Sequence, residues 1–363
     1  MNENYRTLGD YIEIIDERNK GLAFDNLLGI SIAKKFIPSI ANIVGTDLSN
    51  YKIVRTGQFA YGPVTSRNGE KISIAFLDGD DCIISSSYTV FRVIKENELA
   101  PEYLMLWFSR PEFDRYARYK SHGSVREIFD WNEMCMVKLP VPDINKQRNI
   151  VKAYKAITDR IALKQKINDN LEQQAQAIYY NFISSKTYNG ILKDIIIENK
   201  KSKIKVNEAK NTKGKYPFFT SGEAILEYNT YLVDNKNIYL NTGGNADIKY
   251  YIGKASYSTD TWSIKAIDNL TDYCYLFLKT MKNEINSIYF EGSALKHLQK
   301  KKLLEKQIYI PNKTEIQDLN SLLMPIFEMI SKNTSENRHL IYIRDILLPK
   351  LISDELDVSV IDL

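Results

Sequence analysis

The 363-residue sequence predicts an α+β protein with two similar mixed α/β domains, separated by two long antiparallel helices of the coiled-coil type. Three observations predict this fold. The chain is too long for one comfortable hydrophobic core and fits two domains of about 150 residues. Its second half repeats the first at a constant spacing, and each half ends in a long helical pattern. We therefore expect an internal pseudo-twofold repeat, with one domain and one helix in each half.

The repeat is clearest around two glycine-serine pairs. Gly123-Ser124 aligns with Gly292-Ser293 and Pro142 with Pro311, in both cases 169 residues apart and without a gap. Upstream, EYLMLWFS at 102–109 matches DYCYLFLK at 272–279 with an offset of 170. Because both matches keep the same order, each half is predicted to be a globular region followed by a long helix.

These boundaries divide the chain into four segments. We expect a first domain at 1–142, a central spacer helix at 143–185, a second domain at 186–310, and a C-terminal spacer helix with a tail at 311–363. Alternating apolar residues predict strands within the globular regions, and 102–110 is predicted to be a helix between strands. The strand-like runs are 71–76, 83–93, 237–240 and 248–252. The segment SSKTYNG at 184–190 is typical of a linker.

The two helical patterns carry matching apolar positions at spacings of three and four. Polar residues interrupt both at the same place, Lys164 and Asn168 in the first and Asn333 and Asn337 in the second. We expect the helices to pack on each other over roughly 34 residues, with the polar positions fixing the register. Packing of each helix on its own domain remains an alternative. Pro325 and Pro349 are expected to shorten or kink the second helix. The repeating positions are Ile150, Tyr154, Ile157, Ile161, Leu171, Ala175, Ile178 and Phe182, and Leu319, Leu323, Ile326, Ile330, Leu340, Arg344, Leu347 and Leu351.

The composition excludes several classes of protein. With 44% hydrophobic and 26% charged residues, the chain is typical of a folded protein rather than a disordered one. No stretch is apolar enough for a membrane span and the N-terminus is unlike a signal peptide, so we expect a cytoplasmic protein without a membrane partner. Cys82, Cys135 and Cys274 are far apart, which predicts buried thiols rather than disulfides or a zinc site.

Motifs that mark catalysis are missing. The sequence has no GxxxxGK[ST] phosphate loop, no GxGxxG after a strand, no HExxH and no NPPY-type methyltransferase motif. His122, His297 and His339 are too scattered for a metal cluster. We therefore expect no catalytic residue, metal or cofactor in this chain, and an enzyme with an unrecognised site remains a minor alternative.

Basic runs recur at equivalent places in the two halves. The segment 115–126 (RYARYKSHGSVR) has four basic and no acidic residues, and 296–306 (KHLQKKKLLEK) follows the equivalent Gly292-Ser293. A third run, 198–215, is rich in lysine. Each run alone is typical of an ordinary solvated face, but the recurrence favours contact with the phosphates of a nucleic acid.

Polar residues on expected turns supply candidates for contact with bases and phosphates. Base edges are recognised by side chains that donate and accept hydrogen bonds. The same residue types are favoured in turns, so a purely structural role is equally compatible with the sequence. The candidates are Thr65, Ser66, Arg67, Asn68, Lys71, Ser86, Ser87, Tyr88, Arg115, Arg118, Lys120, His122, Ser124 and Arg126 in the first half, and Asn241, Thr242, Asn245, Lys249, Lys254, Thr259, Asp260, Thr261, Trp262, Ser293, Lys296 and His297 in the second.

The arrangement of the chain resembles the specificity subunit of type I restriction-modification systems. The resemblance covers nearly the whole chain and rests on LEQQAQAIYYNFI at 171–183, IRDILLPKLISDEL at 343–356, and the helix entries LPVPDINKQ and IYIPNKTEIQ. The arrangement is more specific than any one of these motifs, since each alone matches many helices.

The resemblance implies a function. Each globular region would be a target recognition domain that binds one half of a bipartite target in double-stranded DNA, with the helices as spacer. The chain itself would be a non-catalytic DNA-recognition subunit. Catalysis would belong to partners, namely two methyltransferase subunits that use S-adenosylmethionine for DNA methylation and a motor-nuclease subunit that uses ATP and Mg²⁺. Outward-facing helix residues are candidates for docking the methyltransferase: Lys152, Lys155, Arg160, Gln173, Gln174, Gln176 and Tyr180. The main alternative is a two-domain protein-interaction scaffold without sequence-specific DNA binding.

Overall fold

The computed structural model describes residues 5–39, 45–66, 68–69, 71–122, 127–212, 214–222 and 224–352. The chain divides into two compact units, which are described separately. The first unit is Met1–Arg160 with Ile341–Leu363, and the second unit is Ile161–Leu340. Both units are mixed α/β, and each contains part of both long helices, so the predicted fold class is confirmed.

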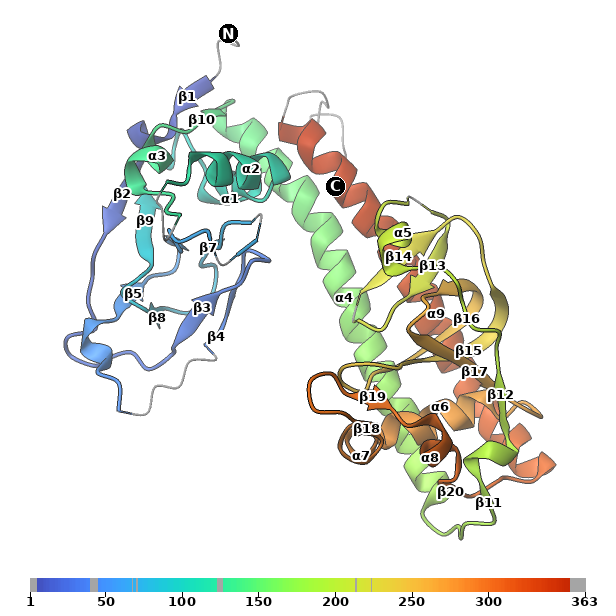
Figure 1. Cartoon of the computed structure of the whole chain (residues 1–363). Coiled ribbons are helices and arrows are strands. Elements are labelled where there is room, and N and C mark those ends of the chain that lie inside the picture. The colour runs from blue at the N-terminus through green and yellow to red at the C-terminus, as the bar shows by residue number, and fades with distance from the viewer. Residues whose placement is uncertain are drawn as a thin grey trace. The chain divides into compact units, whose positions relative to one another are not determined.

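The first unit is built on a four-stranded antiparallel sheet packed against two short helices (Figure 1). Its helices are η1 (Leu8–Asp10), η2 (Leu48–Asn50), α1 (Pro101–Phe108), α2 (Pro111–Lys120) and α3 (Trp131–Cys135). Its strands are β1 (Tyr5–Thr7), β2 (Ile12–Ile15), β3 (Leu28–Ile30), β4 (Phe36–Pro38), β5 (Lys52–Val54), β6 (Phe59–Tyr61), β7 (Ile74–Phe76), β8 (Cys82–Ile84), β9 (Thr89–Val93) and β10 (Lys138–Pro140). The sheet order is β2-β9-β6-β7, and Phe59 and Phe91 stack on it under Phe108 of α1.

The second unit contains a longer sheet of six strands. Its helices are η3 (Leu192–Asp194), α5 (Val206–Lys210), α6 (Thr271–Thr280), α7 (Lys282–Ile288) and α8 (Lys300–Leu304). Its strands are β11 (Gly190–Ile191), β12 (Ile196–Glu198), β13 (Tyr216–Phe219), β14 (Ile225–Tyr228), β15 (Val233–Asn241), β16 (Ile248–Tyr257), β17 (Thr261–Ala266), β18 (Phe290–Glu291), β19 (His297–Leu298) and β20 (Gln307–Ile308). The sheet order is β12-β17-β15-β16-β13-β14, in which only the β13–β16 pair is parallel.

The elements of the two units correspond one to one along much of the chain. The order β2-β9-β6-β7 recurs as β12-β17-β15-β16, and the pair β1-β10 recurs as β11-β20. Even a single side-chain hydrogen bond is repeated. Tyr103 Oη donates to Pro140 O at 3.2 Å, and Tyr273 Oη donates to Tyr309 O at 2.5 Å. The repeat seen in the sequence is therefore a repeat of structure.

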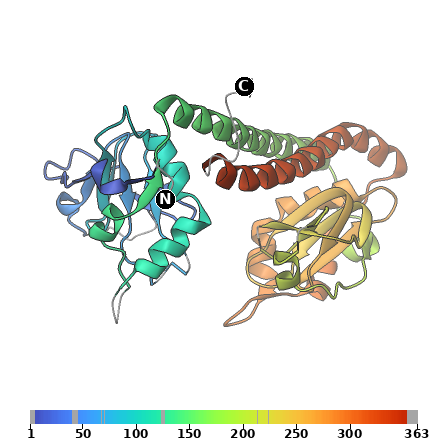
Figure 2. The same cartoon turned by 90° about the horizontal axis from the view of Figure 1, so that it is seen from above.

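Two 40-residue helices, α4 (Ile144–Ile183) and α9 (Lys313–Ile352), run antiparallel and side by side (Figures 1 and 2). In the second unit, Asn168 Nδ2 donates to Ile330 O at 3.5 Å and Asn337 Nδ2 donates to Ile161 O at 3.2 Å. The repeat offset of 169 residues exchanges these two contacts, so the local pairing is itself pseudo-symmetric.

Most of the predicted packing positions belong to the hydrophobic core of their own unit or pack against it. Leu347 and Leu351 pack into the core of the first unit, in which Ile157 is half-buried. Ile161 and Leu340 are half-buried beside the polar positions of the second unit. The remaining predicted positions belong to the core of the second unit or pack against it: Leu171, Ile178, Phe182, Ile326 and Ile330.

Three sequence expectations are wrong in whole or in part. The expected shortening of α9 at Pro325 and Pro349 is wrong, because α9 is continuous through both, with Ile326 and Leu348 buried beside them. A kink at either proline stays a prediction. The run 83–93 is not one strand, because a turn in which Tyr88 N donates to Ser85 O separates β8 from β9. The thiol residue Cys135 is only partly buried.

Candidate nucleic-acid interface

Three loops of the second unit are hydrogen-bonded to one another. The 242–247 loop joins β15 to β16, and the 258–260 turn joins β16 to β17. Thr242 donates to Asp260 O through both its N (3.1 Å) and its Oγ1 (3.0 Å). The 292–297 loop is attached because Gly244 N donates to Lys296 O at 2.9 Å. Candidates that are distant in the sequence are therefore brought together: Thr242, Asn245, Thr259, Asp260, Ser293, Lys296 and His297.

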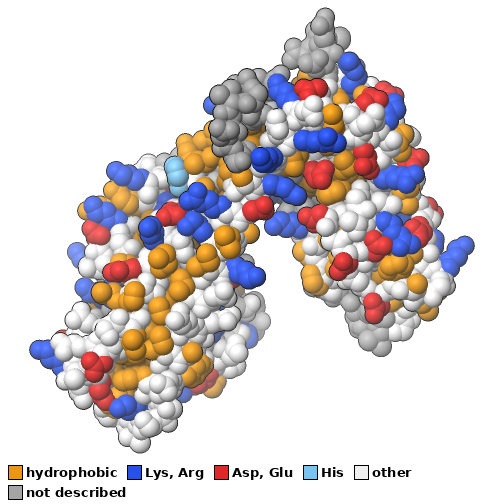
Figure 3. Space-filling view, turned by 180° about the vertical axis from the view of Figure 1, so that it is seen from behind, with side chains coloured by type: hydrophobic (Ala, Val, Ile, Leu, Met, Phe, Trp, Pro, Cys, Tyr) orange, Lys and Arg blue, Asp and Glu red, His pale blue; other side chains and the backbone are white. Residues whose placement is uncertain are grey.

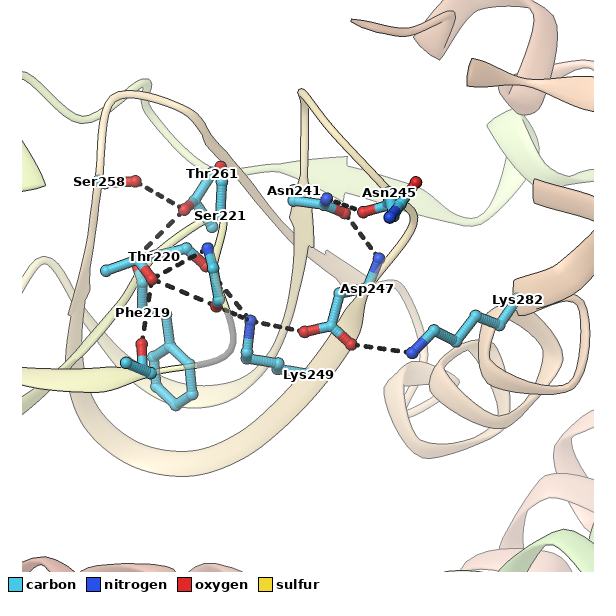
Figure 4. A network of polar contacts seen from close by, with 12 residues as sticks. Phe219, Thr220, Ser221, Asn241, Asn245, Asp247, Lys249, Ser258, Thr261 and Lys282 are labelled. Atoms are coloured by element: carbon cyan, nitrogen blue, oxygen red, sulfur yellow. Dashed lines mark hydrogen bonds and ion pairs between the residues drawn. The ribbon is translucent and has the colours of Figure 1, made fainter. Parts of the chain in front are cut away.

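A fourth loop, 220–222, belongs to the same cluster and was missed in the sequence. Ser221 Oγ donates to Asp260 O. Lys249 Nζ donates to Gly222 O at 2.7 Å and to Thr220 O at 3.3 Å (Figure 4). The Ser-Gly pair that follows the aromatic strand was the available signal for a turn. We call residues 220–222, 242–247, 258–260 and 292–297 the second loop cluster.

The ammonium group of Lys249 has partners inside this cluster, which favours a structural role over direct contact with DNA. Its ammonium pairs with Asp247 at 2.7 Å in addition to the two carbonyls, and its side chain is only 16% exposed. Asp247 also pairs with Lys282 at 3.3 Å, as Figure 4 shows. Burial raises the pKa of the Asp247 carboxyl, but the two lysines outweigh it and hold that pKa below its usual value. Asp247 therefore stays ionised and keeps both lysines in place.

Three further candidates of the second unit are buried and support the fold instead. Asn241 is 4% exposed, accepts from Asp247 N at 2.7 Å and donates to Gly243 O at 3.0 Å. Thr261 is 5% exposed and donates to Phe219 O at 3.2 Å. Trp262 is 3% exposed, and its Nε1 donates to Glu198 at 2.6 Å. Their polar atoms already have partners, which favours structural roles for these three residues.

The lysine-rich segment 198–215 passes beside the second loop cluster. Thr259 N donates to Ile204 O at 3.0 Å, and Tyr257 Oη donates to Lys200 O at 2.6 Å. Lys300 lies over the Trp262 ring at 4.8 Å, and burial lowers its pKa, with the charge of Lys201 adding to the shift. Exposed Lys254 lies over the Tyr231 ring at 4.9 Å. The lysine-rich segment therefore lies beside the 258–260 turn of the cluster.

The first unit brings the equivalent three segments together. The 62–73 loop joins β6 to β7, and Thr65 N donates to Glu127 O at 2.9 Å. His122 N donates to Ile128 O at 3.1 Å, which closes the 121–128 segment. A Cβ at Gly62 would lie 3.4 Å from the Tyr88 ring, so the 85–88 turn is also adjacent. We call the described residues of 62–73, 85–88 and 121–128 the first loop cluster.

Within the first loop cluster the candidates differ in exposure. Thr65 is 2% exposed, and its Oγ1 donates to Ser121 Oγ at 2.9 Å, which favours a structural role. Asn68 and Tyr88 are half-buried. Ser66, Lys71, Ser86, Ser87 and His122 are exposed. Arg67, Ser124 and Arg126 lie outside the described residues.

The basic run of the first unit is less positive in three dimensions than in sequence. Each described cation of 115–122 has a carboxylate neighbour from the flanking sequence. Figure 3 likewise shows Lys and Arg side chains among Asp and Glu side chains on one face of this unit. The pairs are Arg115–Glu112 at 3.0 Å, Arg118–Glu127, Lys120–Glu133 at 3.4 Å and His122–Glu133 at 3.8 Å. To contact phosphates, these cations would have to exchange their carboxylate partners for phosphate oxygens.

The part of the chain that the structure describes contains neither a metal cluster nor a membrane span. In those residues no group of three or more His, Cys, Asp and Glu side chains is arranged to hold a metal ion. None of the described helices is both long and apolar enough to span a membrane.

The comparisons with known proteins all find members of one family. Residues 5–173 and 185–337 match the family model of the type I restriction modification DNA specificity domain. The specificity subunit of the type I restriction enzyme MjaIX from Methanocaldococcus jannaschii is 25% identical over 316 residues, 74% of this chain and 72% of the relative. The HindI specificity subunit from Haemophilus influenzae is 25% identical over 182 residues, 48% of this chain and 39% of the relative. A crystal structure of the type I S subunit from M. genitalium has the same fold, with a TM-score of 0.58, 14% identity and 97% coverage of both chains.

Proposed function

Because the chain belongs to the type I restriction modification DNA specificity family, we propose that each loop cluster binds one half of a bipartite DNA sequence. The family role is sequence-specific DNA recognition by a non-catalytic subunit, which works in a complex with other restriction-modification subunits. One observation supports the proposal most strongly. Equivalent loops converge in both units, although the residues on them differ. Two loop clusters with the same architecture and different residues can bind two different half-sites.

Each cluster offers two kinds of contact. Exposed lysines can neutralise phosphates, which contributes affinity without sequence preference. Exposed polar residues at the loop tips, such as Ser86 and Asn245, can hydrogen-bond to base edges. We assign recognition to 1–142 and 186–310, and spacing to 143–185 and 311–363. A 40-residue helix spans ~60 Å at ~1.5 Å per residue, which is enough to separate two half-sites on one duplex.

Catalysis then belongs to partner chains. We propose two methyltransferase subunits that use S-adenosylmethionine, because a repeated chain offers each surface twice. A motor-nuclease subunit would use ATP and Mg²⁺, and the complex would act on DNA in the cytoplasm. Exposed residues of α4 that are candidates for methyltransferase docking include Lys152, Lys155, Arg160, Gln173, Gln174 and Tyr180.

Salt-dependent DNA binding tests the proposed function. The purified chain, alone and with its methyltransferase, should bind double-stranded DNA more weakly as salt increases, with a linear dependence of log K on log salt. With the methyltransferase, DNA that carries the target should compete better than scrambled DNA. Absence of DNA affinity at low salt in both preparations would overturn the proposal in favour of a protein-interaction scaffold.

A further inference from the structure

Asp260 lies where the loops of the second cluster meet. Its carbonyl oxygen accepts hydrogen bonds from Thr242 N, Thr242 Oγ1 and Ser221 Oγ, which come from two other loops. The residue is nevertheless exposed. Because the backbone is fixed from several sides, the carboxylate of Asp260 starts from a defined position in the free protein. Such preorganisation reduces the entropy that binding would otherwise lose.

The charge of Asp260 is unusual for its surroundings. Its neighbour Thr259 donates to Ile204 O, so the turn lies beside Lys203 and Lys205. Among the residues that the structure describes, no Lys or Arg forms an ion pair with Asp260. DNA phosphates would repel a carboxylate in this position. A carboxylate that contacts DNA directly therefore has to meet a hydrogen-bond donor there, and exocyclic amino groups are the donors on the major-groove base edges.

We propose that Asp260 is a specificity-determining residue of the second unit, whose carboxylate accepts a hydrogen bond from an exocyclic amino group, cytosine N4 or adenine N6. The inference rests on the proposed function and assigns a role within one half-site. Guanine and thymine present carbonyl acceptors, O6 and O4, at the corresponding places in the major groove. Asp260 would therefore select C or A over G or T at one position of one strand.

Base-resolution mapping of methylation in cells with the full chain and its methyltransferase tests this role. The wild type should show C or A at one position of the second half-site, and the base found there identifies which amino group is bound. D260A should accept all four bases at that position, with discrimination falling from about 10- to 100-fold to within about threefold. D260N should admit G or T, because an amide also donates. The first half-site should stay unchanged in both variants.

The control is D268N. Asp268 is exposed beyond the opposite end of β17, and its positive φ of 48° is one that Asn also adopts readily. This variant removes the same charge from the same unit and should leave the motif intact. Thermal unfolding of all three variants should match the wild type, since both carboxylates are exposed.

The result that overturns the inference is an unchanged motif in D260A and D260N, with or without tighter binding of all DNA. Such a result would show that Asp260 affects only the overall affinity for DNA, through its charge. Failure of the proposed function looks different, because the wild type itself would then show no bipartite motif.

Discussion

The side chain of Lys249 connects two loops of the second cluster through one ammonium group. It donates to carbonyl oxygens of Thr220 and Gly222 on one side and pairs with Asp247 on the other. A flexible four-carbon side chain with three donors suits this task, because each donor can point at a different loop. We therefore expect Lys249 to affect DNA recognition through the loops that it holds.

We predict that K249M lowers both stability and selectivity. Two carbonyls lose a charged donor and Asp247 keeps only Lys282, so unfolding free energy should fall by about 1–3 kcal/mol. Urea unfolding measures this loss, and competition between specific and scrambled DNA should show weaker discrimination. K265M is the matched control, since Lys265 lies in the same sheet, near the end of β17 that is far from the 258–260 turn. Equal discrimination by K249M and wild type would contradict the positioning role.

At this scale the sequence indicated the loops but not the direction of their side chains. Ser66 and Thr65 are adjacent polar residues in one turn, yet the first is exposed and the second is 2% exposed. Turns favour polar residues for contacts to their own backbone as much as for contacts to a ligand. Only the hydrogen-bond partners of Thr65, Asn241 and Thr261 identify them as structural.

Among the elements, the starts of the long helices were the most predictable. Asp143 Oδ1 accepts from Lys146 N at 3.0 Å at the start of α4, and Asn312 Oδ1 accepts from Glu315 N at 3.0 Å at the start of α9. Both are N-cap contacts, and the two caps are equivalent in the repeat. Glu315 also accepts from Asn312 N at 2.9 Å, which completes a capping box.

Glu315 makes the start of α9 sensitive to acid. Hydrogen bonds from Lys186, Asn312 N and Tyr309 lower the pKa of its carboxyl to about 2. This pKa lies below the value of about 4.3 expected in the unfolded chain, so the stabilisation is present above pH ~4.3 and is lost as the pH falls towards ~2.

Thermal unfolding between pH 5 and pH 2 should therefore show a smaller acid-induced loss in E315Q than in the wild type. The amide that this substitution introduces cannot titrate, so the contribution of Glu315 to the pH dependence disappears. Identical pH profiles for the two proteins would show that this carboxylate does not contribute.

The polar layer between α4 and α9 should behave as a coupled unit. Asn333 Nδ2 donates to Asn168 Oδ1 at 2.9 Å, and Lys164 Nζ donates to Asn333 Oδ1 at 3.0 Å. Both asparagines are buried, so N168L alone leaves Asn333 Nδ2 without its acceptor and should cost about 1–3 kcal/mol.

The double variant N168L/N333L should recover part of that loss, because two apolar residues can pack without an unpaired amide. A double-mutant cycle by urea unfolding measures the coupling. Strictly additive losses would contradict a shared polar layer. The sequence predicted these residues because they interrupt both apolar patterns at one repeat position. The continuity of α9 through its two prolines could not be predicted in this way, because it depends on how the residues around the prolines pack.

For the whole molecule, the internal repeat was the most informative feature of the sequence. It predicted two domains of one design, and the structure confirms that the strand order β2-β9-β6-β7 recurs as β12-β17-β15-β16. The loop 220–222 was not predicted, because the strands β13 and β14 that it joins extend the second sheet beyond the part that the two sheets share. Such an addition to one half leaves no trace in a comparison of the two halves.

The central claim is that each unit recognises its own half of the target. Exchange of residues 1–142 for the corresponding region of another specificity subunit, followed by methylome sequencing with the methyltransferase present, tests it most directly. We predict that one half of the methylated motif changes while the other half is retained. A change in both halves, or in neither, would contradict the claim.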